Sequence, residues 1–449
     1  MSSNSIVSYH PTAGLSYDPT ESIYWDADAL RAETTRVFEV CHGCRMCFKF
    51  CDSFPNLFEF IEKTEGEDVR KLTGEQIDAV MGDCFQCKLC EVQCPYTPRE
   101  NHEFQLDFPK LVHRWSAQRH RRVGAGLRER ILGDPDQAGR IARWLPSVAN
   151  RLNRSSLHRW FGEKLLGIHR DARLPNWAPT SFETWARGAG RVRPAEDGIE
   201  IVLFPTCTVQ NHEPDIGRDT LEVLDRNGAS SACTEGLACC GMPAWEHGDL
   251  PAVTRQAAAT LDVLMPYVAR GAKVLVLQPS CAMMLRREWP TMLDGPDRQR
   301  AKRLAEAVVE PGEWLWSIRK EARFNTDFKT GPGETVHYHV PCHLRAQAVG
   351  FRSRELLKKL PGVTSVPAVT ECCGHDGTYA MKVESHDASA RIGQRAFDGM
   401  KEGNSEVWVT DCALAGLQFE QHAGRRALHP MTVLARSYRG ESFAPLRKP

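Results

Sequence analysis

Eight cysteines near the start of the chain form two groups with the same spacing. Each group follows the pattern C-x-x-C-x-x-C-x-x-x-C, and Pro95 follows the second group. Three thiolates at successive three-residue steps suit three iron corners of one cubane, and the fourth cysteine lies too far along the chain and ligates the other cluster. A zinc site would favour two separate C-x-x-C pairs, so the spacing favours iron–sulfur chemistry. We predict two 4Fe-4S clusters, with cluster 1 on Cys41, Cys44, Cys47 and Cys94, and cluster 2 on Cys84, Cys87, Cys90 and Cys51.

Eight further cysteines fall into two matching sets, each containing the tripeptide Cys-Cys-Gly. Counterparts in the two sets lie 131–135 residues apart, which indicates an internal duplication. The apolar runs IVLF, VLVL, VHYHV and VWV precede single cysteines and predict buried parallel strands, whose carboxyl ends are the usual place for ligands. We therefore expect each set to form a redox or metal site, although buried cysteine is also a common core residue. The sets are Cys207, Cys239, Cys240 and Cys281, and Cys342, Cys372, Cys373 and Cys412.

The surrounding residues predict a fold of the α+α/β class with a helical N-terminal part. Asp26 and Thr73 are candidate helix N-caps, and Leu57, Phe58 and Ile61 share one helix face. The alternation of strands and helices from about residue 198 predicts parallel sheets. The expected divisions are a flexible N-terminus (1–24), a helical two-cluster ferredoxin-type domain (25–109), a basic amphipathic helical connector (110–190), and two cysteine-rich α/β domains (191–325 and 326–449).

The connector has an unusual charge and aromatic pattern. Residues 110–175 contain 15 Lys and Arg against 5 Asp and Glu, although the whole chain is neutral. One predicted helix face carries Ile141, Trp144 and Leu145, and another carries Leu157, Trp160 and Phe161. Apolar and indole side chains beside arginines are typical of a membrane interface. The alternatives are a linker that packs on neighbouring domains and a docking surface for an acidic partner.

Composition narrows the class of protein. The 449 residues carry 57 basic and 57 acidic side chains, which with the lack of a recognisable base-reading motif argues against nucleic acid as a partner. The first twenty residues show no secretion signal, and no apolar run reaches the 18 residues of a transmembrane helix. We therefore expect a reducing cytoplasm, in which the 17 cysteines are more often metal ligands or redox groups than disulfides. The sequence contains neither a dinucleotide-binding G-x-G-x-x-G after a strand nor a P-loop. Electrons must therefore come from a partner.

These motifs resemble those of iron–sulfur subunits with two cysteine-rich CCG domains behind a two-cluster ferredoxin module. That group includes the anaerobic glycerol-3-phosphate dehydrogenase C subunit, the glycolate oxidase iron–sulfur subunit and heterodisulfide reductase B/D-type subunits. The resemblance implies a cysteine, a Cys-Cys-Gly and a C-x-x-C in each repeat, which hold a further 4Fe-4S cluster in heterodisulfide reductase. Here the last cysteine is replaced by Met284 in the first repeat and by Ala415 in the second. Four candidate ligands remain in each repeat, so a cluster in one, both or neither CCG domain stays open.

We therefore expect an oxidoreductase subunit that transfers electrons. A flavoprotein dehydrogenase or a rubrerythrin-like diiron protein would supply electrons, which would pass through the two 4Fe-4S clusters and the CCG domains to a quinone or similar acceptor. The expected location is the cytoplasm, and the connector suggests an additional peripheral association with the inner face of the cell membrane. The alternative is a heterodisulfide reductase-like catalytic subunit in which a CCG-bound cluster carries out thiol–disulfide chemistry. No catalytic residue is assigned.

Overall fold

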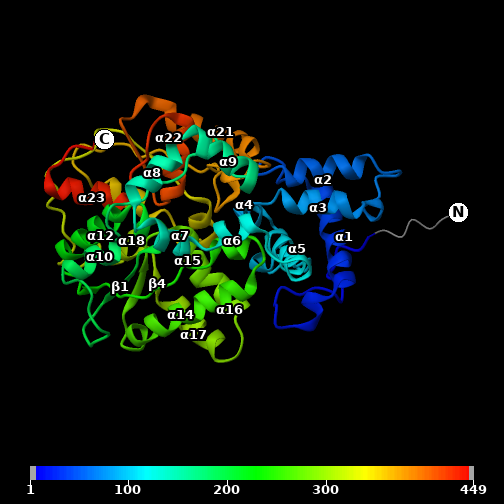
Figure 1. Ribbon diagram of the computed structural model, residues 1–449, viewed down its shortest axis with the longest axis horizontal. Helices are drawn as coiled ribbons and strands as arrows, with labels where there is room; N and C mark the ends of the chain where they lie inside the picture. Colours follow the sequence, from blue (N-terminus) through cyan, green and yellow to red (C-terminus); the bar gives the residue numbers. More distant parts are fainter. Residues whose placement is uncertain (1–6, 444–449) are drawn as a thin grey trace. The chain divides into compact units, whose positions relative to one another are not determined.

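The computed structural model describes residues 7–443 and divides into two compact units (Figure 1). The first unit contains residues up to Gly126 together with Ala244–Leu250, and the second contains Leu127–Pro243 and the chain from Pro251 onward. The second unit groups most of the expected connector with both expected cysteine-rich domains, and the first unit extends beyond the expected two-cluster domain (25–109). The helix that follows residue 107 belongs to the first unit, and so does a short segment of the first cysteine-rich repeat.

The first unit is helical, as predicted. Asp26 caps the first long helix by accepting a hydrogen bond from Ala29 N at 2.7 Å, and Thr73 forms a capping box with Gln76. Leu57 and Ile61 are fully buried in the core of this unit. Its α-helices within residues 7–126 are α1 (Ala27–Cys44), α2 (Ser53–Glu62), α3 (Gly74–Gly82), α4 (Leu89–Gln93) and α5 (Phe108–Val123).

Trp245 explains why segment 244–250 belongs to the first unit. Its side chain is 0% exposed, and its ring stacks on the His113 ring of α5 at 4.3 Å. The Lys88 ammonium lies 5.1 Å from the centre of the same indole ring. A large aromatic side chain that is fully buried contributes strongly to packing. The sequence around Trp245 contains no pattern that predicts this contact.

Two buried arginines hold the N-terminal segment against the helices. Arg36 donates to Tyr9 O at 2.8 Å, and Arg114 donates to Gly14 O at 2.7 Å and to Tyr24 O at 2.8 Å. Hydrogen bonds to a buried charged group are among the stronger ones. The segment from Tyr9 to Tyr24 is therefore bound to the first unit, whereas the sequence predicts a flexible N-terminus over 1–24. Residues 1–6 lie outside the described residues.

The second unit begins with short helices of the connector and continues into the first repeat. The connector helices are α6 (Leu127–Gly133), α7 (Pro135–Ala142), α8 (Pro146–Arg154), α9 (Ser156–Leu166) and α10 (Phe182–Gly188). The first repeat forms a parallel sheet of order β2-β1-β3-β4, in which β1 pairs with β3 from Ile201–Lys273 to Phe204–Val276. Its strands are β1 (Ile201–Phe204), β2 (Ser231–Ala232), β3 (Lys273–Val276) and β4 (Val308–Val309).

Helices accompany this sheet, and Figure 1 shows α14, α16 and α17 gathered beside β4. The α-helices of the repeat are α11 (Thr206–Asn211), α12 (Pro214–Arg226), α13 (Met242–Glu246), α14 (Leu250–Ala269), α15 (Pro279–Met283), α16 (Trp289–Met292), α17 (Gly295–Ala307) and α18 (Pro311–Ser317). Its strand β1 is fully buried, as expected for parallel strands covered on both faces.

The second repeat has a smaller parallel sheet of order β6-β5-β7. Its strands are β5 (Val336–His339), β6 (Ala368–Val369) and β7 (Val407–Thr410), and its α-helices are α19 (Cys342–Gln347), α20 (Arg352–Leu357), α21 (His386–Lys401), α22 (Ala413–Ala423) and α23 (Pro430–Arg439). The two repeats pack through several helix pairs, including α12 with α23 and α18 with α20. A third pair is α15 with α19, which carry Cys281 and Cys342. The predicted α+α/β class with a repeated parallel unit is confirmed.

Candidate iron–sulfur and cysteine-rich centres

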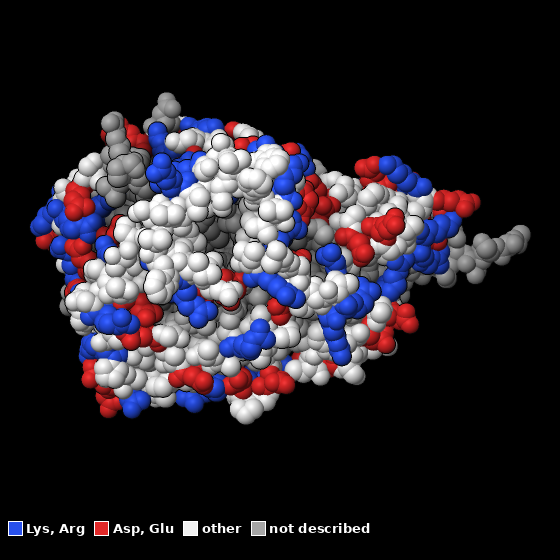
Figure 2. Space-filling model, in the orientation of Figure 1, with Lys and Arg blue, Asp and Glu red and all other residues white. Residues whose placement is uncertain are grey.

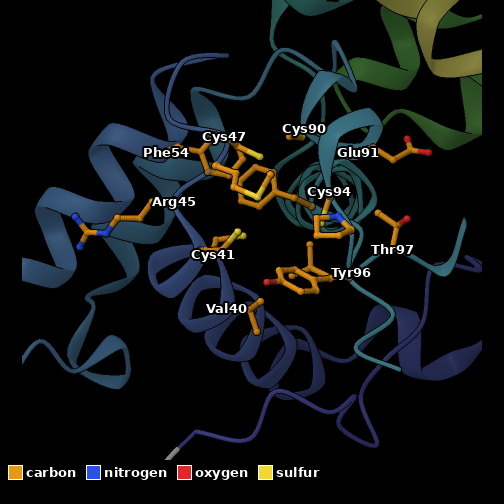
Figure 3. Close-up of a pocket in the computed structure, with 15 residues that line it drawn as sticks. Val40, Cys41, Arg45, Cys47, Phe54, Cys90, Glu91, Cys94, Tyr96 and Thr97 are labelled. Atoms are coloured by element: carbon orange, nitrogen blue, oxygen red, sulfur yellow. The ribbon is translucent and has the colours of Figure 1, made fainter. Parts of the chain in front are cut away.

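The structure brings Cys94 to the first cysteine group. Cys41 and Cys44 lie in the last turn of α1, Cys47 follows in a turn, and Cys94 follows the end of α4. These four cysteines line one pocket together with Cys90, and Figure 3 shows the labelled thiols of Cys41 and Cys47 facing this hollow. The arrangement agrees with a cluster whose fourth ligand comes from the other motif.

The two cysteine motifs bend in the same way. Arg45, between Cys44 and Cys47, has φ +57°, and Lys88, between Cys87 and Cys90, has φ +60°. Few residues other than glycine adopt this left-handed conformation, so its appearance at equivalent positions is informative. The shared turn returns the next cysteine toward the same centre in each motif.

The thiols are packed where a negative charge is unfavourable. Burial raises the pKa of Cys47 to about 12, and the nearby Cys94, Cys44, Cys51 and Cys87 thiols contribute in the same direction. Burial also raises the pKa of Cys90 well above its usual range, with contributions from Cys47, Cys87, Cys84 and Cys51. Buried thiolates become favourable when cations neutralise them, so these donors fit iron ions, whose binding would release protons.

The first Cys-Cys-Gly set is a continuous series of thiols. Cys240 Sγ lies 3.1 Å from Cys281 Sγ, and thiol hydrogen bonds also join Cys207 to Cys239 and Cys239 to Cys240. Trp289, which is fully buried, donates from Nε1 to Cys240 O at 3.0 Å. The structure thus brings together all four predicted donors of this repeat. The remaining cysteine, Cys233, lies in the hydrophobic core.

A carboxylate from the connector reaches the same set. Asp136 Oδ2, on α7, accepts a hydrogen bond from Cys239 N at 2.6 Å and lines a pocket with Cys207 and Cys239. Burial raises the pKa of Asp136. Helix α7 contacts α11, the helix of Cys207, and a Cβ at Gly139 would lie 2.7 Å from the Asn211 side chain. Close packing at Gly139 therefore helps to place Asp136 beside the thiols.

The second set has a different hydrogen-bonding environment. Gln278, at the end of β3 in the first repeat, donates from Nε2 to Cys412 Sγ at 2.9 Å. Burial raises the pKa of Cys412, and charge repulsion from Cys373 and Cys342 adds to this effect. In contrast, a hydrogen bond from Cys372 lowers the pKa of Cys373. The four cysteines of the second set therefore lie close enough to affect one another's pKa.

Asp136 and Gln278 were not predicted from the sequence. Asp136 is part of a D-P-D sequence that is typical of an ordinary helix start, and nothing in the sequence indicates that its helix lies against the first cysteine set. Gln278 lies just beyond the carboxyl end of a strand. The rule that ligands bind at the carboxyl ends of parallel strands, which predicted the strand-end cysteines, therefore also applies to Gln278. Met284 and Ala415, at the positions of the absent cysteines, are both 0% exposed.

The glycine of the second Cys-Cys-Gly turn offers a stability test. Gly374 has φ +77°, and a Cβ there would lie 2.1 Å from Ser389 O. Gly236 has φ +75° with open space around it, so it is a matched control. Gly236→Ala should cost about 1–2 kcal/mol in backbone strain, and Gly374→Ala should add about 1–3 kcal/mol from the clash. Thermal midpoints of the cluster-loaded variants measure this difference, and equal midpoints would contradict the tight turn.

Comparison with known proteins identifies the domains. Residues 201–286 and 336–420 match the family described as Cysteine-rich domain (CCG), and residues 40–97 match the 4Fe-4S dicluster domain. The chain therefore combines one region that matches a 4Fe-4S dicluster domain with two regions that match the CCG domain. Both the predicted resemblance and the iron–sulfur cofactor class are confirmed.

Its relatives include a dehydrogenase subunit and lactate utilization proteins. The chain is 27% identical over 312 residues to the C subunit of anaerobic glycerol-3-phosphate dehydrogenase from Escherichia coli (strain K12), covering 69% of this chain and 77% of that protein. It is 29% identical over 192 residues to lactate utilization protein A of Shouchella clausii, and 29% identical over 194 residues to that of Geobacillus kaustophilus, each covering 41% of this chain and 76% of the relative. The protein is an iron–sulfur subunit of an oxidoreductase.

Proposed function

We propose that this protein conducts electrons from a dehydrogenase partner through its two 4Fe-4S clusters and CCG domains to a quinone or similar acceptor. The observation that carries the proposal is the convergence of Cys94 with Cys41, Cys44 and Cys47 on one pocket, because it supports the crossed ligand set of a two-cluster carrier. In such a protein the fold holds the clusters and adjusts their potentials through burial and hydrogen bonds. The cluster ligands are the eight predicted cysteines of the first unit.

The CCG domains are proposed as the next redox centres. The four thiols of the first set form a connected group, and Asp136 offers a carboxylate oxygen beside Cys239. The repeat has Met284 in place of a fifth cysteine. We assign a 4Fe-4S cluster to this first set. Gln278 would stabilise the more reduced state of a centre on the second set, because hydrogen bonds to sulfur adjust the potential.

The partner and substrate follow from the relatives. Of the three relatives named above, the one with the longest match is a dehydrogenase subunit whose name specifies glycerol 3-phosphate, so a flavoprotein that oxidises this compound is the proposed donor. Lactate is the competing substrate, because the other relatives are named for lactate utilization. A rubrerythrin-like protein is the third candidate donor.

The connector is proposed to lie at a membrane surface, close to the quinone. Trp144 is 87% exposed, and Leu145, Leu157, Phe161 and Leu165 are also exposed. Figure 2 shows a hollowed, uncharged area over α7–α9 with basic side chains at its margin. A cavity of about 780 Å³ there is lined by Trp160 and by Arg154, Arg170 and Arg173, among others. No helix within residues 7–443 is both long and apolar enough to span a bilayer, so the proposed association is peripheral, at the inner face of the cell membrane.

Anaerobic affinity purification from the native host tests the proposal. We expect a flavoprotein to co-purify, and we expect glycerol 3-phosphate to bleach the iron–sulfur absorbance of the complex, with reoxidation by a soluble quinone. Bleaching by lactate alone would move the substrate assignment to the lactate relatives. A complex in which no co-purified protein reduces the clusters, whatever the substrate, would contradict the proposed electron path.

Thiol–disulfide chemistry at the second set is the second candidate function, supported by the lowered pKa of Cys373. A lower pKa increases the thiolate fraction that can attack a disulfide. If this function operates, Cys373→Ser should abolish disulfide reduction by the holoprotein but leave quinone reduction within about twofold. Cys233→Ser, at the cysteine that lies outside both sets, is the matched control and should leave both activities unchanged. Loss of quinone reduction in Cys373→Ser, with no disulfide turnover in the wild type, would favour electron transfer alone.

A further inference from the structure

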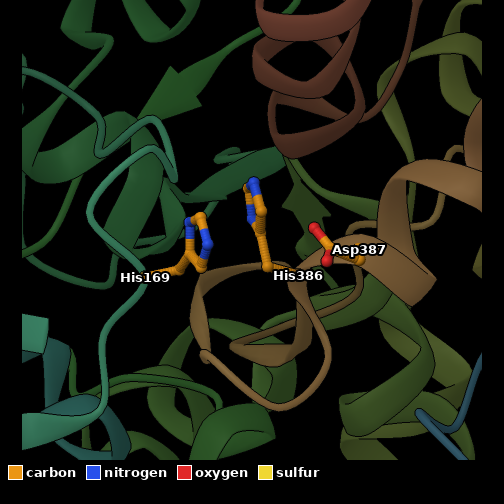
Figure 4. A group of neighbouring side chains, drawn as sticks. All are labelled: His169, His386 and Asp387. Atoms are coloured by element: carbon orange, nitrogen blue, oxygen red, sulfur yellow. The ribbon is translucent and has the colours of Figure 1, made fainter.

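Two histidines and an aspartate from distant parts of the chain meet in the second unit. His169 follows α9 in the connector, and His386 and Asp387 begin α21. One ligand atom from each residue lies within 4.8 Å of the other two, and Figure 4 shows the three side chains together. The two imidazole rings are stacked, with centroids 3.9 Å apart and planes 11° from parallel. None of these residues belongs to the cysteine sites.

The backbone segments that carry the two histidines are fixed to each other. Ile168 forms an antiparallel bridge with Lys382, and His169 N donates to Met381 O at 2.8 Å. Val383 N donates to Gly167 O at 3.0 Å on the other side of the bridge. These bonds hold the connector against the residues just before α21. The proximity of the two rings is therefore a property of the fold.

Hydrogen bonds also orient the rings. His386, which is 8% exposed, donates from Nδ1 to Ala380 O at 3.0 Å, so Nε2 is the ring nitrogen that remains for a metal ion. A backbone carbonyl on one imidazole nitrogen is the usual support of a histidine that binds metal through the other nitrogen. His169 Nδ1 accepts a hydrogen bond from Asp171 N at 3.2 Å, so Nε2 is the nitrogen of this ring that can bind a metal ion.

The electrostatics favour a cation over two protons. Two imidazolium rings at a centroid separation of 3.9 Å would repel each other, whereas one cation bound to both rings would replace two positive charges on the rings themselves. His422 lies nearby, with its ring 6.1 Å from that of His386. The Asp387 carboxylate supplies a negative charge beside the rings. Two imidazoles and one carboxylate are a donor set that suits Zn²⁺ and similar divalent transition metals.

We propose that His169, His386 and Asp387 bind one divalent transition-metal ion of the Zn²⁺ class. The ion would join the connector to the second CCG domain, with water completing its coordination. Helix α21 also carries Ser389, whose hydroxyl donates to Gly374 O at 2.8 Å in the Cys-Cys-Gly turn. The ion would therefore bind at the N-terminal end of α21, the helix that supports the Cys-Cys-Gly turn. The stacked rings would tilt so that both nitrogens reach the ion.

Zinc binding to the anaerobic, cluster-loaded full chain tests the proposal. We expect the wild type to retain one more Zn²⁺ per chain than His386→Ala or Asp387→Asn, with unchanged iron and labile sulfide. His158→Ala is the matched control, because His158 is an exposed histidine on α9 of the same connector, and it should bind zinc like the wild type. Asp387 is exposed, so its variant avoids a folding defect.

X-ray absorption at the zinc edge distinguishes this site from the cysteines. The expected first shell contains nitrogen and oxygen at about 2.0–2.1 Å, whereas zinc on cysteine would show sulfur at about 2.3 Å. Equal zinc content in the wild type, His386→Ala and Asp387→Asn would overturn the proposal. A sulfur shell would overturn it as well. Neither result would affect the proposed electron path, which is measured by iron, sulfide and cluster reduction.

Discussion

Replacing Cys41 and Cys94 together with serine should remove one 4Fe-4S cluster, about four iron atoms per chain, and leave the second cluster of the first unit intact. The reason is that the two thiols line one pocket although they come from different motifs. Loss of either ligand already destabilises cluster 1, so the second substitution has no further cluster to remove. Iron and labile sulfide in anaerobically reconstituted protein measure the effect, and the CCG domains contribute equally to every variant.

A second double variant makes this experiment decisive. Cys41 and Cys51 belong to the same motif but are assigned to different clusters, so their joint replacement should remove about eight iron atoms. If each motif instead held its own cluster, the results would be reversed. The Cys41/Cys94 variant would then lose about eight atoms, and the Cys41/Cys51 variant about four. That reversed pattern would refute the crossed assignment.

Asp136→Asn should shift the reduction potential of a cluster on the first CCG set upward. The carboxylate lies at hydrogen-bond distance from Cys239 N, and its negative charge opposes the addition of an electron. A single charge about 5–8 Å away corresponds to about 90–140 mV for a one-electron couple at an effective dielectric constant near 20. Asparagine keeps an oxygen acceptor for the Cys239 amide. An EPR-monitored redox titration measures the shift, and it is carried out on the alkaline side of neutrality because burial raises the pKa of Asp136.

Asp134→Asn is the control for this variant. Asp134 is the N-cap of the same helix and accepts a hydrogen bond from Gln137 N at 2.9 Å, a role that asparagine also performs. We expect its potential and EPR spectrum to match the wild type. Equal potentials in Asp136→Asn and the wild type, with the cluster present, would show that Asp136 does not interact with the first set.

Local patterns predicted much of this protein. The N-caps Asp26 and Thr73 and the buried strands before the cysteines follow from spacing and residue type, which report short-range geometry. The duplication predicted two parallel sheets, because repeated strand and helix patterns admit few topologies. The prediction that the fourth cysteine of each motif binds the other cluster is also local, because it depends only on the spacing of the cysteines within one motif.

Contacts between distant segments were not predictable in this way. Gln278 in the first repeat reaches Cys412 in the second, and the pairing depends on how α15 and α19 pack. Likewise, Trp245 follows a Cys-Cys-Gly turn in the sequence but is buried against His113. His169 and His386 are 217 residues apart in the sequence and meet through one backbone bridge. Such contacts arise from tertiary packing, for which a single sequence carries no periodic signal.

Metal analysis combined with EPR of the anaerobically purified, dithionite-reduced wild type tests the central claim most directly. The account predicts at least about eight iron and eight labile sulfide per chain, and the spectrum of reduced 4Fe-4S clusters. The zinc ion proposed at His169 and His386 would add one metal without altering that spectrum. A colourless protein that contains zinc in place of iron and gives no EPR signal would contradict the account, because its cysteines would then form a structural scaffold.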